Sequence, residues 1–176
     1  MALNSQITNN IESLYNILIR PFFNIAHYLN RNNKKNSQKN ISKHYDLNNI
    51  FFAQFLDKSM MYSSAIYRNT KENLELAAKN KLRIICNKLQ LKKTDHVLEI
   101  GTGWGGFAIY AATHFNCKVT TTTISKQQFL YTSNKIKKLK LQKNIKVIFK
   151  DYRDLKGSFD KVVSIEMIEA VGHKYY

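Results

Sequence analysis

Four glycines and one acid in a short stretch of the chain have the types and spacing of a ligand-binding loop. The apolar run at 97–100 contains Glu99, four glycines follow within residues 101–106, and a helix-like segment continues from 107 to 112. Glycine lets a backbone turn sharply and lie against a ligand, and a helix N-terminus offers free N–H groups to a carboxylate or phosphate. The stretch therefore predicts a strand, a ligand-cradling loop and a helix, the first unit of a nucleotide-binding α/β sheet.

The glycine spacing is compatible with two classes of nucleotide. Gly101, Gly103 and Gly106 also satisfy the dinucleotide pattern G-x-G-x-x-G, but a dinucleotide fold places an acid about 20 residues further on, and residues 119–125 contain none. Glu99 precedes the first glycine, where its carboxylate suits the sulfonium and ammonium of S-adenosylmethionine. The pattern favours S-adenosylmethionine over NAD. A glycine turn without a ligand is less favoured, because four glycines exceed what one turn requires.

The elements around this loop alternate in the manner of a parallel sheet. The sequence predicts strands at 96–100, 118–123, 145–149 and 161–165, with helices at 105–114 and 126–138. Strands separated by helices form parallel sheets that bind ligands at the carboxyl ends of the strands. Most of the polar groups that could serve a site follow those ends, at 99–103, 123–125, 150–152 and 164–169.

The chain before the sheet is predicted to be helical. Residues 72–89 have the pattern of an amphipathic helix, whose apolar face comprises Leu74, Ala77, Ala78, Leu82, Ile85 and Leu89. Residues 11–29 also have helical spacing, interrupted by Pro21; they predict either two short packed helices or an amphipathic segment in a membrane interface. Residues 31–40 are basic and aperiodic, as in a linker or exposed arm. We therefore divide the chain into a helical and basic extension (1–40), a segment that covers the cofactor (41–90) and an α/β domain (91–176).

The net charge of +16 indicates an anionic partner, either a nucleic acid or a phospholipid surface. Many lysines gather around the second predicted helix, where they form either a solvated face or a patch that faces phospholipid or RNA; these are Lys126, Lys135, Lys137, Lys138, Lys140, Lys143, Lys146 and Lys150. No recognition module supports nucleic acid.

No apolar run approaches the roughly 20 residues of a membrane span, and Cys86 and Cys117 form no metal-type cluster, so we expect a cytoplasmic protein without a metal site.

From His44 onward the chain resembles the cyclopropane-fatty-acyl-phospholipid synthase family, within the S-adenosylmethionine-dependent methyltransferases. Six motifs in the family's order carry the resemblance: HYDLNNIFF (44–52), LDKSMMYSSAIY (56–67), VLEIGTGWGG (97–106), TTISKQQ (122–128), DYRDL (151–155) and FDKVVSIEMIEAVGHKYY (159–176). The fold that it implies is a Rossmann-like α/β methyltransferase sheet, truncated after strand 4, with an N-terminal helical extension.

The resemblance also implies a reaction and a set of site residues. The family adds the activated methyl group of S-adenosylmethionine to a cis double bond of a phospholipid acyl chain, and a bound bicarbonate takes a proton as the ring closes. By position, the cofactor contacts are Tyr62, Ser63, Glu99, Gly101, Gly103, Thr123, Gln128, Asp151 and Tyr152. Glu169 orients bicarbonate, the backbone near Glu166 lines the same pocket, and Ser64 takes the catalytic position where the family often has Cys. A helix-dipole role remains the alternative for Glu166 and Glu169.

The match corresponds to the N-terminal part of the family. The family continues with three more strands and with the His and Tyr that complete the bicarbonate site. We therefore expect a split or incomplete form that needs a second chain, and an uncovered edge at the fourth strand. The partner expected from the resemblance is a membrane surface with unsaturated acyl chains, with the protein held peripherally at its inner face. Formation of a homo-oligomer, methylation of acyl chains or small amines, and a non-catalytic cofactor- or membrane-binding remnant stay open as alternatives.

Overall fold

The structure is a computed structural model, and it describes Ser37, residues 49–167 and Val171. The chain divides into two compact units, Met1–Asn36 and Ser37–Tyr176. The first unit lies outside the described residues. The predictions for 11–29 and for the basic stretch 31–40, except Ser37, therefore concern residues that the structure does not describe.

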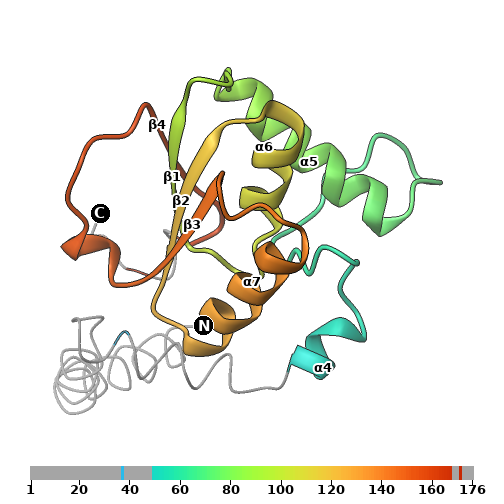
Figure 1. Ribbon diagram of the computed structural model, residues 1–176. Helices are drawn as coiled ribbons and strands as arrows, with labels where there is room; N and C mark the ends of the chain where they lie inside the picture. The colour runs from blue at the N-terminus through green and yellow to red at the C-terminus, as the bar shows by residue number, and fades with distance from the viewer. Residues whose placement is uncertain (1–36, 38–48, 168–170, 172–176) are drawn as a thin grey trace, which may run out of the picture. The chain divides into compact units, whose positions relative to one another are not determined.

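A sheet of four parallel strands forms the centre of the second unit (Figure 1). The strands are β1 (His96–Ile100), β2 (Lys118–Thr123), β3 (Ile145–Phe149) and β4 (Lys161–Ser164), in the spatial order β3-β2-β1-β4. Ile100 is paired with Thr122 on one side and with Ser164 on the other, so the carboxyl ends of the central strands are level. The predicted parallel α/β sheet is confirmed, although β4 ends one residue earlier than expected.

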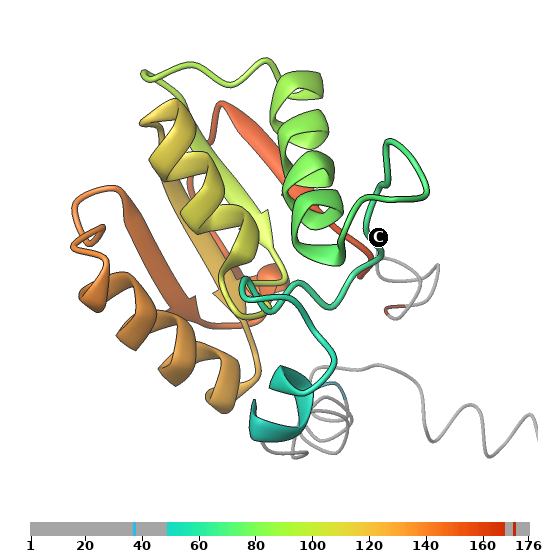
Figure 2. The ribbon, with the colours of Figure 1, turned by 90° about the vertical axis from the view of Figure 1, so that its right-hand side faces the viewer.

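Three helices lie on one face of this sheet (Figures 1 and 2). They are α5 (Leu74–Lys88), α6 (Gly106–Phe115) and α7 (Lys126–Lys138). Their apolar side chains and those of the strands form one core, which includes Leu82, Val97, Phe107, Ala111 and Val119. The connection from β3 to β4, which contains the 3₁₀ helix η2 (Tyr152–Asp154), runs on the opposite face (Figure 1). No helix in the described part of the chain is long and apolar enough to cross a bilayer.

Side-chain caps determine where α5 and α7 begin. The side chain of Asn73 accepts a hydrogen bond from the Leu76 N–H, and that of Ser125 accepts one from the Gln128 N–H. Such caps satisfy N–H groups that have no partner within the helix. The Asn73 cap explains why α5 starts two residues later than predicted.

The predicted apolar face of α5 needs one correction. Leu74 is 39% exposed because it occupies the first position of the helix, whereas Asn80 and Lys81 are buried among the core residues. A polar side chain that is buried in this way needs a hydrogen-bond partner. Both have one, and the partner of Lys81 belongs to the candidate site.

The two edge strands of the sheet differ in character. The edge strand β3 carries Lys146, and Lys150 follows directly after it; both lysines are exposed. Charged side chains on an edge strand oppose unwanted pairing with other chains. At the other edge, β4 pairs with β1 among the described residues, and Val162 is 54% exposed.

Candidate functional site

The glycine loop after β1 is bent back onto the end of β2. Gly101, Gly103 and Gly105 all have positive φ, at 95°, 52° and 82°, a conformation that glycine adopts without strain. The backbone N–H groups of Gly101 and Thr102 both donate to the carbonyl of Thr122 at 3.0 Å. Among the described residues, no atom beyond the two adjacent residues of the chain lies within 4 Å of where a Cβ atom on Gly103 would stand. The loop therefore faces open space at Gly103, as a backbone that receives a ligand must.

Glu99 is the buried acid of the site. Its side chain is 3% exposed, and its Oε2 atom has no hydrogen-bond partner in the described structure. Burial raises the pKa of Glu99 to about 8, and an interaction with the Thr121 hydroxyl acts in the opposite direction. A buried carboxyl oxygen without a partner is costly. A cationic ligand at the glycine loop would supply the missing partner and favour the ionised form.

The end of β2 presents a row of buried hydroxyl groups. The Thr121 hydroxyl donates to that of Thr102 at 2.8 Å, and the Thr123 hydroxyl donates to Oε1 of Gln128 at 2.9 Å. Thr122 donates to the carbonyl of Lys150 at 2.6 Å. The structure therefore brings two of the expected cofactor contacts, Thr123 and Gln128, together at the carboxyl end of β2, beside the glycine loop.

Residues 57–64, here called the covering segment, lie over the start of α6. The carboxylate of Asp57 organises this segment by accepting hydrogen bonds from the Ser59 N–H at 3.0 Å, the Ser59 hydroxyl at 2.9 Å and the Met61 N–H at 3.1 Å. A Cβ atom on Gly106 would lie 2.5 Å from Cε of Met61. The absence of a side chain at Gly106 therefore lets the covering segment approach α6 closely.

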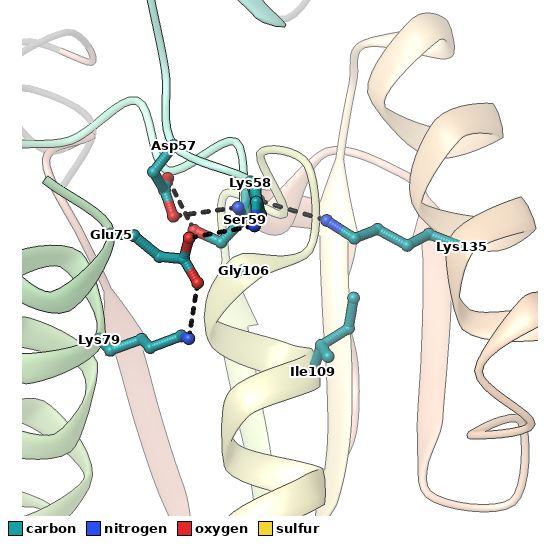
Figure 3. A pocket seen from close by; sticks show the side chains of 8 residues that line it. All are labelled: Asp57, Lys58, Ser59, Glu75, Lys79, Gly106, Ile109 and Lys135. Atoms are coloured by element: carbon teal, nitrogen blue, oxygen red, sulfur yellow. Dashed lines mark hydrogen bonds and ion pairs between the residues drawn. The ribbon is translucent and has the colours of Figure 1, made fainter.

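A cavity of about 170 Å³ lies between the covering segment and the three helices (Figure 3). Glu75 pairs there with Lys79 at 2.8 Å and with Lys58 at 3.7 Å, and Lys135 donates to the carbonyl of Ser59 at 3.3 Å. Burial lowers the pKa of Lys135, and the charge of Asp57 acts in the opposite direction. None of the predicted site residues that the structure describes lines this cavity. Its charged groups join the covering segment to α5 and α7.

Two adjacent serines of the covering segment are held by two other elements. Lys81 of α5 donates to the hydroxyl of Ser63, which itself donates to Sδ of Met61 at 3.2 Å. The Ser64 hydroxyl donates to Oε1 of Glu166 at 2.7 Å, and its N–H donates to both carboxylate oxygens at 3.0 and 3.1 Å. These contacts join the covering segment to α5 and to the turn that follows β4.

Aromatic side chains fix the remaining part of the covering segment. The ring of Tyr62 is 59% exposed and packs against Phe52 and Trp104, with centroids 5.7 and 6.4 Å apart. The Trp104 indole N–H donates to the side chain of Asn49 at 2.8 Å. The short helix α4 (Asn49–Ala53) is thereby attached to the glycine loop, beside Tyr62.

The last predicted cofactor contacts lie after β3. The carboxylate of Asp151 caps η2 and accepts hydrogen bonds from the Arg153 side chain at 2.8 and 2.6 Å, while Tyr152 is partly buried in η2. The Asp151 carboxylate is therefore already paired with a guanidinium group. Glu169, the expected bicarbonate residue, lies outside the described residues.

Several groups of the site were not predicted from the sequence. They are Asp57, Lys81 and Lys135, together with the carboxylate of Glu166, which was expected to act through the helix dipole or its backbone. Lys81 had a detectable signal, because it lies three and four residues after Ala78 and Ala77, on the apolar face of its helix. Glu166 had none, since its partner Ser64 is 102 positions away in the chain.

A parallel sheet of this order, with a buried acid near the end of β1 and a glycine turn directly after the strand, defines the class of the protein as a Rossmann-like methyltransferase. Residues 32–176 match the model of the family described as mycolic acid cyclopropane synthetase. The chain belongs to this family.

Relatives of known sequence and structure agree with this assignment. The cyclopropane-fatty-acyl-phospholipid synthase of Escherichia coli K12 is 40% identical over 151 residues, which are 86% of this chain and 38% of that protein. A probable fatty acid methyltransferase of Pseudomonas putida is 40% identical over 142 residues, which are 80% of this chain and 36% of the relative. The chain thus spans little more than a third of the length of these relatives.

Solved structures show the same fold. The cyclopropane synthase MmaA2 from Mycobacterium tuberculosis superimposes with a TM-score of 0.75 at 28% identity, covering 78% of this chain and 48% of that one. The mycolic acid cyclopropane synthase CmaA1, solved with SAH and CTAB, gives a TM-score of 0.74 at 28% identity and the same coverage.

Proposed function

We propose that this chain forms the cofactor-binding part of an enzyme that transfers one carbon from S-adenosylmethionine to a cis double bond of phospholipid acyl chains. The observation that carries the proposal is the buried Glu99 carboxyl with an unpartnered Oε2, placed beside a glycine loop that is open at Gly103. A cationic, nucleoside-bearing cofactor satisfies both features. Membership of the cyclopropane synthetase family supports the transfer of one carbon to an acyl double bond as the reaction.

Each of the predicted contacts is assigned to one part of the proposed cofactor. Gly101 and Gly103 accommodate its amino-acid end, which Glu99 complements in charge. Thr123 and Gln128 serve the ribose. Tyr62 and Ser63 cover the cofactor from the other side, and this position agrees with the packing of Tyr62 against Trp104 of the glycine loop.

Asp151 and Tyr152 bracket the adenine in this proposal. When bound, the cofactor supplies an electrophilic methyl group, and the residues of the chain hold it and exclude water. A site of this kind stabilises the cation that develops on the acyl chain through fixed charges and a positioned base.

We also propose that a planar oxyanion has a place beside Ser64, as the bicarbonate of the family implies, with Glu169 as its second contact. The two donors of Ser64 suit such a group, since they already bind a carboxylate. In the structure that carboxylate belongs to Glu166, so an external oxyanion would have to displace it.

The proposed substrate is a membrane phospholipid, so the protein would act at a membrane surface. We propose peripheral binding to the cytoplasmic face, supported by the net charge of +16 and by the exposed lysines after α7. We further propose that a second polypeptide supplies the part of the relatives that lies outside the match. Methyl branching is a second candidate outcome, since a probable fatty acid methyltransferase is as similar as the cyclopropane synthase.

The test is incubation of the purified chain with unsaturated phospholipid vesicles and labelled S-adenosylmethionine, with and without the downstream region of a relative as a second chain. Mass spectrometry with fragmentation distinguishes a ring from a methyl branch. We expect ring product only with the second chain present. No transfer under either condition, together with no calorimetric binding of S-adenosylhomocysteine, would reject the proposal.

A further inference from the structure

Ser64 and Glu166 form a small oxyanion-binding arrangement. Two donors of one residue, its N–H and its hydroxyl, converge on a single carboxylate at 2.7 to 3.1 Å. Hydrogen bonds to an ionised acceptor are stronger than those between neutral groups. The same pair of donors would bind any planar oxyanion of similar size, because nothing in their geometry requires the carboxylate to be part of the chain.

The surroundings of the carboxylate favour negative charge. Lys81 is 4% exposed and interacts electrostatically with Glu166 and with Asp57; these two charges oppose the effect of burial, which lowers the pKa of Lys81. The Glu166 side chain itself is exposed to solvent. Because this side chain reaches solvent among the described residues, it can leave the Ser64 donors, whereas the buried ammonium of Lys81 stays in place.

The backbone at Glu166 indicates that this contact is maintained against a local cost. Its φ is +46°, a left-handed conformation that residues other than glycine, asparagine and aspartate adopt only at a cost in free energy. The three hydrogen bonds to Ser64 offset such a cost. The turn also places Met167 over the glycine loop, where its Sδ would lie 3.4 Å from a Cβ on Gly101.

We propose that Ser64 is an oxyanion site whose internal occupant is the carboxylate of Glu166, so that bicarbonate or formate binds there only when this carboxylate is absent or displaced. The inference rests on the proposed function only for its catalytic consequence, which is that Glu166 controls the access of bicarbonate to Ser64. Its test contains neither cofactor nor lipid, so failure of the methyl-transfer proposal would leave the result intact.

The experiment uses Glu166→Gly in the full 176-residue chain. Glycine removes the carboxylate and also suits the left-handed backbone at this position, so the variant is expected to fold. Thermal unfolding is followed with added formate or bicarbonate against chloride at equal ionic strength. Glu166→Gln is the matched control, because its amide oxygen can still accept from Ser64 and its side chain fills the same space.

We expect a saturable rise in unfolding temperature with formate for Glu166→Gly, and no rise beyond chloride for the wild type or Glu166→Gln. Adding Ser64→Ala to the glycine variant should weaken formate binding by about tenfold or more, since one of the two donors is lost. An equal formate response in the wild type, or none in a folded Glu166→Gly chain, would overturn the proposal.

A measurement on the wild type tests the contact even if the glycine variant fails to fold. The amide proton of Ser64 should resonate further downfield in the wild type than in Glu166→Gln, because a hydrogen bond to an ionised acceptor is shorter and stronger than one to a neutral amide. An identical Ser64 amide shift in the two chains contradicts the internal occupant.

Discussion

Gly105 lies so close to Thr132 of α7 that a Cβ atom on the glycine would stand 2.7 Å from the Thr132 Cγ2 atom. Thr132 is fully buried, and its β-branched side chain has little freedom to turn away. Gly105 also has a φ of +82°. This position therefore requires glycine for two independent reasons.

The first prediction contrasts Gly105→Ala with Gly106→Ala. We expect Gly105→Ala to lower the free energy of unfolding by about 2 kcal/mol or more, from backbone strain and from the clash with Thr132. Gly106→Ala should cost less than about 1 kcal/mol, because the Met61 methyl group that it meets is the end of a flexible side chain and alanine favours the helix. Urea unfolding of both variants tests this, and equal losses would contradict it.

The second prediction concerns cofactor affinity at Gly103. Gly103→Ala should weaken S-adenosylhomocysteine binding by about tenfold or more, because a Cβ would project into the space open to the ligand. Gly157→Ala is the control, since Gly157 also has positive φ and an open surrounding but precedes β4 at the other end of the sheet. Calorimetry should show reduced affinity for the first variant alone. Equal affinities in the two variants would show that the glycine loop does not bind the cofactor.

The third prediction follows from the pKa of Glu99, which burial raises from 4.5 to about 8. Between these two values the folded protein holds a proton that the unfolded chain has released, so the free energy of unfolding falls as pH rises. Glu99→Gln cannot ionise and should lack this part of the slope. Unfolding measured from pH 5 to about pH 8 should show the variant gaining stability relative to the wild type; parallel curves would refute the shift.

The same residue predicts proton release on cofactor binding, as the fourth prediction. Glu99 is mainly neutral near pH 7 in the free protein, and a bound cation favours its ionised form. Binding of S-adenosylmethionine should therefore release a proton, read as a dependence of the calorimetric heat on the ionisation enthalpy of the buffer. Glu99→Gln should bind more weakly and without this dependence. Buffer-independent heat in the wild type would exclude Glu99 as the partner of the cation.

The fifth prediction tests the membrane proposal through the exposed lysines. Changing Lys143 and Lys146 to Gln should weaken binding to anionic vesicles, at about 1 kcal/mol per lysine near the surface. Changing Lys92 and Lys93, which are also exposed, is the control for net charge alone. Sedimentation should also show weaker binding as salt rises, and identical binding to zwitterionic vesicles would reject the proposal.

The regular elements could be predicted from the sequence because their signals are local. β2 at Lys118–Thr123, α7 at Lys126–Lys138 and β3 at Ile145–Phe149 have the bounds that the pattern predicted. A cap such as Ser125 and a period of two or 3.6 residues act within one element. The glycine loop was predicted for the same reason, since its turn needs glycine at positions that are adjacent in the chain.

The distribution of charge was less predictable. Lys135 was grouped with the lysines around the second predicted helix, as part of a solvated face or a patch that faces phospholipid or RNA, yet it is partly buried and donates to the covering segment. Lys137 and Lys138 occupy the last turn of α7, where they complement the helix dipole. Which lysine faces inward depends on the element packed against it, and this is not encoded in the helix itself.

The sequence by itself determined the parallel α/β class, the glycine loop after the first strand and the family, because these depend on short-range periodicity and on motifs in a given order. The tertiary structure alone decided the contacts across long separations. It ordered the strands as β3-β2-β1-β4, buried Lys81 against Ser63 and brought Glu166 to Ser64. The physical reason is that burial and hydrogen-bond pairing depend on which surfaces come into contact when the sheet and helices pack. Local sequence patterns do not predict contacts between residues about a hundred positions apart.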